Sequence, residues 1–409
     1  MARWHRALLS LPACLVAAVA LTWTLRLGWA DILASLGSKE ELRRASRLAP
    51  GKTNYLLRLA ERYEEEGVDT TPLLEAALGH SRRQPAAWIR LGLESELRGD
   101  FGAAERHLLE AARLSALAHP RWTLANYYWR RGEAAKVLHW ARATLAITAD
   151  DPTRLFQLCW QSIPDGVAIL DRAIPDRPLV LAQYLAFLAA ENKLEAASPV
   201  ADRVLGLGNG DYAGPLLAYC DRLLEAQYSR TALARTALGI WNALSTRGWI
   251  RLATLEPERG KSLTNALFSL RPLGRGFDWR IVPTEGLAIS RGSATGALRI
   301  SFSGKQPESC EVLWQYVPLA AGSAYSLGFR YRTAGIGPQT GLRWRILVGE
   351  TDLASPHLAS DEWRGERFDF RTPQRAELAR LVLEYRRVWG TTRIEGDLEV
   401  GDLRLGFDR

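Results

Sequence analysis

The stretch PAAWIRLGLESELRGDFGAAERHLLEAARLSALAHP, from Pro85 to Pro120, determines how the first part of this chain folds. Prolines delimit this stretch and its neighbours at near-regular spacing: Pro50, Pro85, Pro120 and Pro152, separated by 35, 35 and 32 residues. A period close to 34 residues indicates a protein built from repeated units. Each unit is expected to consist of a helix, a tight turn and a second helix.

The residues inside each unit give this repeat a physical basis. Gly67, Gly99 and Gly132 fall where the first helix of a unit must stop, because glycine tolerates the left-handed conformation that ends a helix. Small residues such as Gly92 let the two helices approach closely, and Trp88 is expected to be buried between them. One unit cannot bury its apolar face alone, so the units are expected to stack into a solenoid.

The second unit resembles the tetratricopeptide repeat (TPR). The resemblance lies in Trp88-x-x-Leu91-Gly92, Gly99, Ala104, Leu108 and Ala111, with partial matches at Leu59-Ala60-x-x-Tyr63 in the first unit and at Trp122, Ala125, Gly132 and Ala135 in the third. Helical patterns with a period of 35 residues continue to about Leu255, so residues 31–255 are predicted to form an all-α solenoid. The resemblance implies a surface that holds protein partners and contributes no chemistry of its own.

Residues 1–30 are predicted to be a membrane segment. An uncharged, mostly apolar run of 19 residues from Ala7 to Leu25 follows a basic leader and is long enough to span a bilayer. The segment is either an uncleaved signal-anchor or a signal peptide cleaved at Gly28-x-Ala30. The basic leader favours a cytoplasmic N-terminus. The protein is therefore expected to be anchored in the inner membrane, with the bulk of the chain in the periplasm or outside the cell.

From residue 256 to residue 409 the apolar period changes from that of a helix to that of a strand. Alternating runs occupy residues 297–303, 311–317, 324–332, 342–348, 366–370, 379–386 and 398–405. About eight short strands separated by glycine and proline turns predict a sandwich of two sheets. The fold class is therefore multidomain, α then β: an all-α TPR-like solenoid followed by an all-β sandwich.

This second part resembles the jelly-roll carbohydrate-binding modules and their galactose-binding-like relatives. The residues that carry the resemblance include Phe277-Asp278-Trp279, Gln315-Tyr316-Val317-Pro318-Leu319, Tyr325-x-Leu327-x-Phe329-x-Tyr331-Arg332 and Leu398-x-Val400-x-Asp402-Leu403-x-Leu405. The resemblance implies a jelly-roll sandwich over residues 256–409 and a role in contacting glycan.

Arginines at alternating strand positions provide most of the candidate site. The candidate glycan-binding residues are Arg330, Arg332, Arg343, Arg345, Gln315 and Trp389. Each pair of arginines lies opposite the apolar residues of its own strand, because strand side chains alternate between faces. If the two strands were neighbours, the four guanidinium groups and Gln315 would form one face suited to carboxylate, phosphate or sugar hydroxyl groups. The alternative is a solvated face with internal ion pairs, and Trp389 is either an exposed stacking platform or a buried corner residue.

Composition and motifs argue against several function classes. The net charge of +8 is spread along the chain without a basic run longer than two residues, so no nucleic-acid partner is expected. The four cysteines are far apart and form no Cys-x-x-Cys motif, which predicts neither a zinc site nor a disulfide framework. No catalytic residue, metal or cofactor is predicted from the sequence.

The order of anchor, repeats and jelly roll resembles bacterial repeat proteins associated with exopolysaccharide or O-antigen assembly. The resemblance implies a membrane-anchored scaffold in envelope polysaccharide assembly or export, with protein partners on the solenoid and anionic polysaccharide on the sandwich. Two alternatives remain: a general periplasmic protein–protein adaptor whose sandwich binds no sugar, and a cryptic carbohydrate-active enzyme.

Overall fold

The computed structural model describes residues 2–226, 231–294 and 296–408 of the chain. It consists of fourteen α-helices in the described residues followed by two antiparallel sheets, which confirms the predicted fold class. The chain divides into two compact units, residues 1–175 and residues 176–409. The sequence pattern placed the boundary at residues 255 and 256, where helices give way to strands. The structural division falls earlier because the last four helices belong to the same compact unit as the sandwich.

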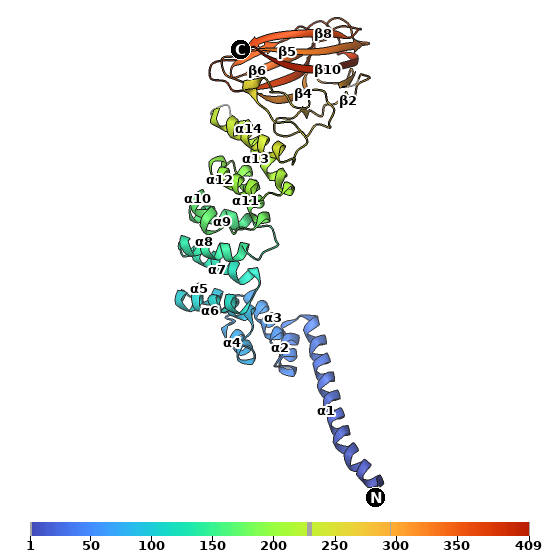
Figure 1. Ribbon diagram of the computed structural model, residues 1–409. Helices are drawn as coiled ribbons and strands as arrows, with labels where there is room; N and C mark the ends of the chain where they lie inside the picture. The colour runs from blue at the N-terminus through green and yellow to red at the C-terminus, as the bar shows by residue number, and fades with distance from the viewer. Residues whose placement is uncertain (1, 227–230, 295, 409) are drawn as a thin grey trace. The chain divides into compact units, whose positions relative to one another are not determined.

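Between residues 2 and 175 the first unit has ten helices, which pair with their neighbours along the chain (Figure 1). They are α1 (Ala2–Leu36), α2 (Lys39–Leu48), α3 (Thr53–Glu64), α4 (Thr71–His80), α5 (Pro85–Leu97), α6 (Phe101–Leu114), α7 (Ala118–Arg130), α8 (Ala134–Leu145), α9 (Thr153–Ser162) and α10 (Gly166–Arg172). The pairs α3–α4, α5–α6 and α7–α8 are the three repeat units that the proline spacing predicts.

The turns inside these three pairs have the predicted glycine geometry. Gly67, Gly99 and Gly132 have φ angles of +70°, +80° and +71°, in the left-handed region. The residue after each glycine donates its backbone N–H back to the preceding helix, as Asp100 does to the Ser95 carbonyl at 2.9 Å. Each first helix therefore ends in a C-cap that satisfies its last carbonyl groups, which confirms the role predicted for the three glycines.

The packing between α5 and α6 is close at Gly92. A Cβ at this position would lie 2.6 Å from Cγ of Leu108, so no larger residue fits without a shift of the helices. Trp88 differs from expectation because it is only partly buried. Its indole N–H reaches outward to the Arg82 carbonyl at 3.0 Å, and its ring lies 5.5 Å from that of His107. Trp88 therefore covers the edge of the pair, while Leu91 and Leu108 fill its interior.

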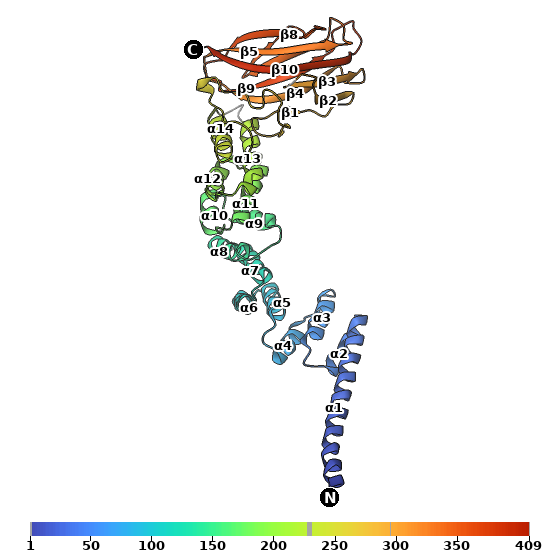
Figure 2. The ribbon, with the colours of Figure 1, turned by 45° about the vertical axis from the view of Figure 1, so that its right-hand side comes forward.

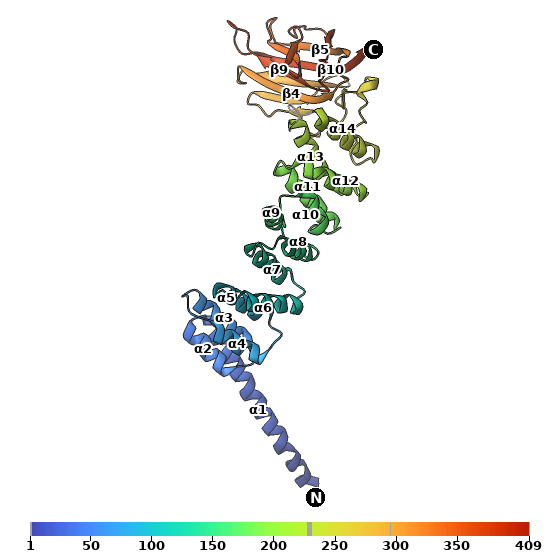
Figure 3. The ribbon, with the colours of Figure 1, turned by 90° about the vertical axis from the view of Figure 1, so that its left-hand side faces the viewer.

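Helix α1 is one continuous helix whose C-terminal end lies beside α2 (Figure 3). Within the described residues, Leu15–Leu36 is the helix segment long and apolar enough to cross a membrane. Ala30 and Ala34 are buried in a cluster with residues of α2 and α3. Asp31 accepts hydrogen bonds from the Lys52 ammonium group and from the Tyr55 hydroxyl. The side chains before Leu15, including the basic leader, lie outside the described residues.

In its described residues, the second unit combines four α-helices with ten strands (Figure 2). The helices are α11 (Pro178–Ala190), α12 (Leu194–Gly206), α13 (Ala213–Ala226) and α14 (Thr231–Thr246). The strands are β1 (Arg280–Ile281), β2 (Leu287–Arg291), β3 (Ala297–Ser303), β4 (Ser309–Pro318), β5 (Ala324–Ala334), β6 (Leu342–Val348), β7 (Thr351–Ala354), β8 (Arg364–Arg371), β9 (Leu378–Arg386) and β10 (Glu395–Asp408).

The strands form two five-stranded antiparallel sheets that lie face to face (Figure 2). The first sheet has the order β1-β4-β9-β6-β7, and the second has the order β2-β3-β10-β5-β8. The inner faces bury one apolar core, whose largest members include Trp279, Trp344 and Tyr385. Because strand side chains alternate, the outer face of each sheet carries the polar residues of the same strands.

The helices of the second unit contact the sandwich through an ion pair and an aromatic cluster. Arg280 of β1 pairs with Asp221 of α13 at 2.6 Å, and both side chains are mostly buried. Burial raises the pKa of the Asp221 carboxyl, and the charge of Arg280 opposes that rise. Trp241 of α14 lies edge-on to Phe277, with ring centroids 5.8 Å apart. Helices α13 and α14 are therefore joined to the sandwich by buried side chains.

Candidate ligand-binding surfaces

The structure separates the four predicted arginines onto two sheets. Arg343 and Arg345 lie on β6 in the first sheet, and Arg330 and Arg332 lie on β5 in the second. Their strands are not neighbours, because β5 pairs with β8 and β10 whereas β6 pairs with β7 and β9. The predicted face carrying all four guanidinium groups therefore does not exist. Each pair lies on the outer face of its own sheet, as the alternation within each strand predicted.

Carboxylates of the same sheet neutralise Arg343 and Arg345. The Arg343 Nε donates to Glu384 Oε1 at 2.6 Å, and the Arg345 guanidinium donates to Glu384 Oε2 at 2.6 Å. Arg345 also forms an ion pair with Asp352, and this hydrogen bond to Asp352 raises the pKa of Arg345. Glu384 is 5% exposed. These two arginines belong to an internal ion-pair network, so they need no anionic ligand.

Gln315 is buried inside the sandwich and does not belong to an outer face. Its amide Nε2 donates to the Thr264 hydroxyl at 2.7 Å and to the Phe277 carbonyl at 2.8 Å. The β4–β9 register shifts between Glu311 and Leu313, and this irregularity changes which β4 residues face the core. Glu311 consequently pairs with Arg380 on the outer face while Gln315 points inward. The sequence prediction for Gln315 is therefore wrong.

Arg330 and Arg332 form a cluster with Trp363 on the outer face of the second sheet. Their guanidinium carbons lie 5.4 and 5.5 Å from the centre of the Trp363 ring. Arg332 pairs with Glu399 at 2.9 Å, and Arg330 pairs with Asp402 at 3.3 Å. The arginines of this cluster are more exposed than Arg343 and Arg345. The cluster contains an aromatic ring, cationic guanidinium groups and carboxylates.

Trp389 is the most exposed large apolar side chain among the described residues, at 94%. It lies in the turn between β9 and β10, which resolves the two sequence interpretations in favour of an exposed residue. The turn is held by its own hydrogen bonds: the Thr391 N–H and hydroxyl both donate to the Val388 carbonyl, and Arg387 donates to the Thr391 carbonyl at 2.7 Å. The indole is therefore presented from an ordered turn.

Three loops meet at the end of the sandwich that carries Trp389. Backbone N–H groups join the β9–β10 turn to its neighbours, from Arg387 to the Glu308 carbonyl at 2.7 Å and from Arg386 to the Gly341 carbonyl at 2.9 Å. The Gln306 amide donates to the Ile394 carbonyl at 2.8 Å. Helix α14 meets the opposite end of β9, where Arg235 pairs with Glu377. The Trp389 end is thus separate from that helix contact.

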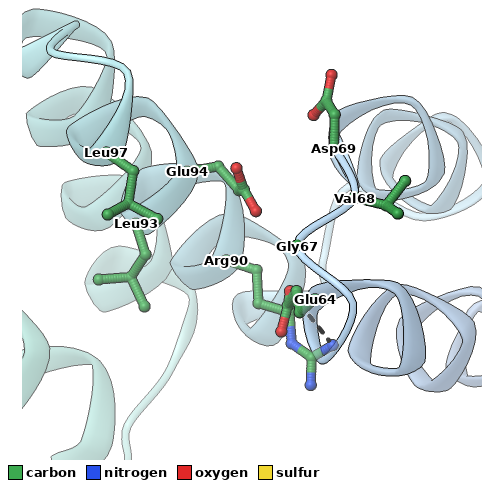
Figure 4. A pocket seen from close by; sticks show the side chains of 8 residues that line it. All are labelled: Glu64, Gly67, Val68, Asp69, Arg90, Leu93, Glu94 and Leu97. Carbon is green, nitrogen blue, oxygen red and sulfur yellow. Dashed lines mark ion pairs between the residues drawn. The ribbon is translucent and has the colours of Figure 1, made fainter.

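A cleft of about 480 Å³ lies in the first unit, between the α3–α4 turn and α5 (Figure 4). Its lining residues are Glu64, Gly67, Val68, Asp69, Arg90, Leu93, Glu94 and Leu97. Leu93 and Leu97 project from α5, and Leu97 is 84% exposed. Desolvation raises the pKa of Glu64, while Arg90 lowers it and Glu94 raises it further. The cleft combines an apolar wall with more carboxylates than cations, which suits a protein segment with apolar and basic side chains.

The described residues contain no group of three or more His, Cys, Asp or Glu side chains arranged to hold a metal ion. Two cysteine thiols lie in the packed interior of the helices. Burial raises the pKa of Cys159 to about 12 and also raises that of Cys220. Because the thiolate is the reactive form, burial makes these two thiols poor nucleophiles.

Sequence reasoning missed the roles of two tryptophans. Trp363 precedes β8 and joins the arginines of β5, a contact that depends on strand pairing rather than on sequence spacing. Trp314 lies on the outer face of the first sheet between two guanidinium groups, those of Arg380 at 4.2 Å and Arg280 at 4.5 Å. Alternation along β4 would have placed Trp314 on the outer face only if the irregularity in the β4–β9 register had been known.

No protein-family model and no curated protein matches this chain. Among solved structures, a family 4 carbohydrate-binding module is 17% identical, with 36% of this chain and 100% of that chain covered and a TM-score of 0.29. The C-terminal part of a TPR repeat-containing protein from Cytophaga hutchinsonii is 13% identical, with coverages of 55% and 94% and a TM-score of 0.30. The C-terminal family 6 module of a laminarinase from Zobellia galactanivorans is 13% identical, with coverages of 31% and 91% and a TM-score of 0.21.

Proposed function

We propose that this protein is a membrane-anchored scaffold that contacts anionic polysaccharide during envelope polysaccharide assembly or export. In this proposal α1 holds the chain in the inner membrane, the helical repeats hold protein partners, and the sandwich contacts glycan outside the cytoplasm. The protein acts by binding and not by catalysis. The apolar exposed part of α1 supports the anchor, and the cleft beside Leu97 supports a protein partner.

The exposure of Trp389 carries the glycan part of this proposal. A tryptophan in water exposes a large apolar ring, and tryptophan is enriched at interfaces, where another molecule covers that ring. The C–H face of a sugar ring fits flat against an indole, and its hydroxyl groups remain in water. Arg386 and Arg393 are exposed near the same turn and would attract carboxylate or phosphate groups on the glycan. In this proposal Trp389, Arg386 and Arg393 form the glycan-binding site, in place of the four-arginine face that the sequence suggested.

Replacing Trp389 by alanine is expected to weaken glycan binding about tenfold or more. Truncation of a tryptophan at the centre of an interface costs about 2 kcal/mol or more, and 1.4 kcal/mol corresponds to a factor of ten in Kd. The measurement uses the full chain in detergent on an array of bacterial polysaccharides, at low and high salt. Trp389→Tyr should retain most of the binding, because it keeps a flat ring.

The matched control is Trp129→Ala, because Trp129 is also exposed but lies on α7 in the first unit. It should leave glycan binding unchanged. If the wild-type chain binds no polysaccharide on the array, or if Trp389→Ala binds as well as the wild type, the glycan part of the proposal is wrong. The adaptor function, with a sandwich that binds no sugar, would then be the better account.

A further inference from the structure

Two hollows of the first unit meet at the α3–α4 turn. The cleft between this turn and α5 adjoins a second hollow of about 460 Å³, which lies between the same turn and α2. Val68 and Asp69 of the turn line both hollows. The other residues of the second hollow come from α2, α3 and α4, and they include Arg43, Arg47, Leu56, Tyr63 and Leu73. The two hollows therefore form one groove that crosses the turn from α5 to α2.

The α5 end of this groove carries an excess of negative charge. Arg90 lies 3.5 and 3.7 Å from two carboxylates of α3, and Arg98 lies 2.6 and 3.6 Å from two others. These four carboxylates belong to Glu61, Glu64, Asp69 and Glu94. Each guanidinium group is shared by two carboxylates, so the charges at this end do not cancel. A cationic group of a ligand would be attracted there.

The α2 end of the groove carries the opposite charge. Arg43 and Arg47 line this end, and both are exposed. The ion pair of Arg43 with Glu40 is long, at 3.9 Å, and its guanidinium lies 5.4 Å from the centre of the Tyr63 ring. Among the residues that the structure describes, no carboxylate forms an ion pair with Arg47. The α2 end can therefore accept an acidic group of a ligand.

Apolar side chains line both halves of the groove. Val68 is 46% exposed at the turn, and Leu93 and Leu97 project from α5 (Figure 4). Leu56 and Leu73 line the half beside α2. An apolar lining with a few charged groups is typical of a binding site, in which the charged groups fix the orientation of the ligand.

We propose that this groove binds a protein segment whose charges follow one order: a basic side chain at the α5 end, apolar side chains in the middle and an acidic side chain at the α2 end. Charge complementarity selects this occupant, because a segment in the reverse order would bring like charges together. A lipid headgroup or an anionic polysaccharide would match the arginines of α2 but would be repelled by the carboxylates beside α5. The inference rests on the scaffold role in the proposed function, but not on glycan binding.

Selection from a phage-displayed library of random peptides tests the charge order, with the full chain in detergent as the target. The selected peptides should carry a basic residue, large apolar residues and an acidic residue in one consistent order. Leu97→Ala should weaken their binding about tenfold, because it removes most of a leucine side chain from the contact. The matched control is Leu117→Ala, since Leu117 is also exposed but lines neither hollow.

A charge exchange locates the basic residue of a selected peptide. Glu64→Lys should weaken binding about tenfold or more, because it replaces an attraction by a repulsion. Changing the basic residue of the peptide to glutamate should restore binding to this variant, which also shows that the variant is folded. Glu75→Lys should bind the original peptide as the wild type does, because Glu75 is exposed on α4 and lines neither hollow.

The outcomes separate the groove from the wider function. Selected peptides without the charge order, binding that survives both Leu97→Ala and Glu64→Lys, or a loss that the exchanged peptide does not restore would each overturn the groove and leave the scaffold role standing. If no peptide is selected, the groove and the protein-partner part of the proposed function are both wrong. Polysaccharide binding by Glu64→Lys should equal that of the wild type, so the glycan part is judged separately.

Discussion

Replacing both Arg343 and Arg345 by alanine is expected to lower the unfolding free energy of the sandwich by about 3–5 kcal/mol, the usual cost of leaving a buried charge without its partner. Glu384 is almost fully buried, and both of its oxygens accept hydrogen bonds from these two arginines. The double variant leaves this carboxylate without its arginine partners. The sequence pattern placed this arginine pair on an outer face, but it did not indicate that the carboxylate joining the two arginines is buried.

Hydrogen exchange of the full chain measures this loss, because peptides from β6 and β9 should lose protection while those from the first unit keep theirs. Arg367→Ala is the matched control, since Arg367 and its partner Asp369 are both mostly exposed. It should change stability by less than about 1 kcal/mol. Adding Glu384→Leu to the double variant should restore most of the protection, because it removes the isolated charge. Full protection in the double variant would refute the buried network.

The second large effect is expected for Trp241→Ala, at about 3–5 kcal/mol in the second unit, as for other large-to-small changes of buried aromatic residues. Trp241 is fully buried, donates its indole N–H to the Ala253 carbonyl at 3.1 Å and packs edge-on to Phe277. Its removal leaves a cavity between α14 and the segment that leads into β1.

Because this cavity lies between helices and sandwich, loss of hydrogen-exchange protection should appear in both α13–α14 and residues 275–281. Trp129→Ala serves again as the control, because it removes the same side chain from a partly exposed position in the first unit. If Trp241→Ala destabilised α14 and left residues 275–281 fully protected, the last helices and the sandwich would be independent folding units. The boundary near residue 255 that the sequence suggested would then be the better description of folding.

The helical repeats could be predicted from sequence because their signals are local. Gly67, Gly99 and Gly132 end helices through the conformation of single residues, and the prolines fix the period. The strands between 297 and 405 could be predicted for the same reason, because alternation needs only neighbouring residues. The burial of Trp88 was predicted wrongly because a side chain at the edge of a helix pair is covered only if a neighbouring segment packs over it. The Trp88 indole N–H instead donates to the carbonyl of Arg82, which lies outside the α5–α6 pair.

The candidate site could be predicted only in part, because it depends on long-range pairing. Alternation correctly placed Arg330 and Arg343 opposite the core, but it could not show that β5 and β6 belong to different sheets. A one-residue irregularity in β4 reversed the orientation of Gln315, and no composition signal marks it. The exposure of Trp389 could not be settled from sequence, since a tryptophan in a turn is equally suited to a corner of the core.

The most direct test of the glycan-contacting scaffold is photo-crosslinking from position 389 in the intact envelope of the native host. A photoreactive benzoylphenylalanine in place of Trp389 should give a broad high-mass adduct that disappears on chemical hydrolysis of the polysaccharide. The same probe in place of Trp129 should give no such adduct. A discrete protein adduct at position 389, insensitive to that hydrolysis, would contradict glycan contact and identify the sandwich as a protein-binding module.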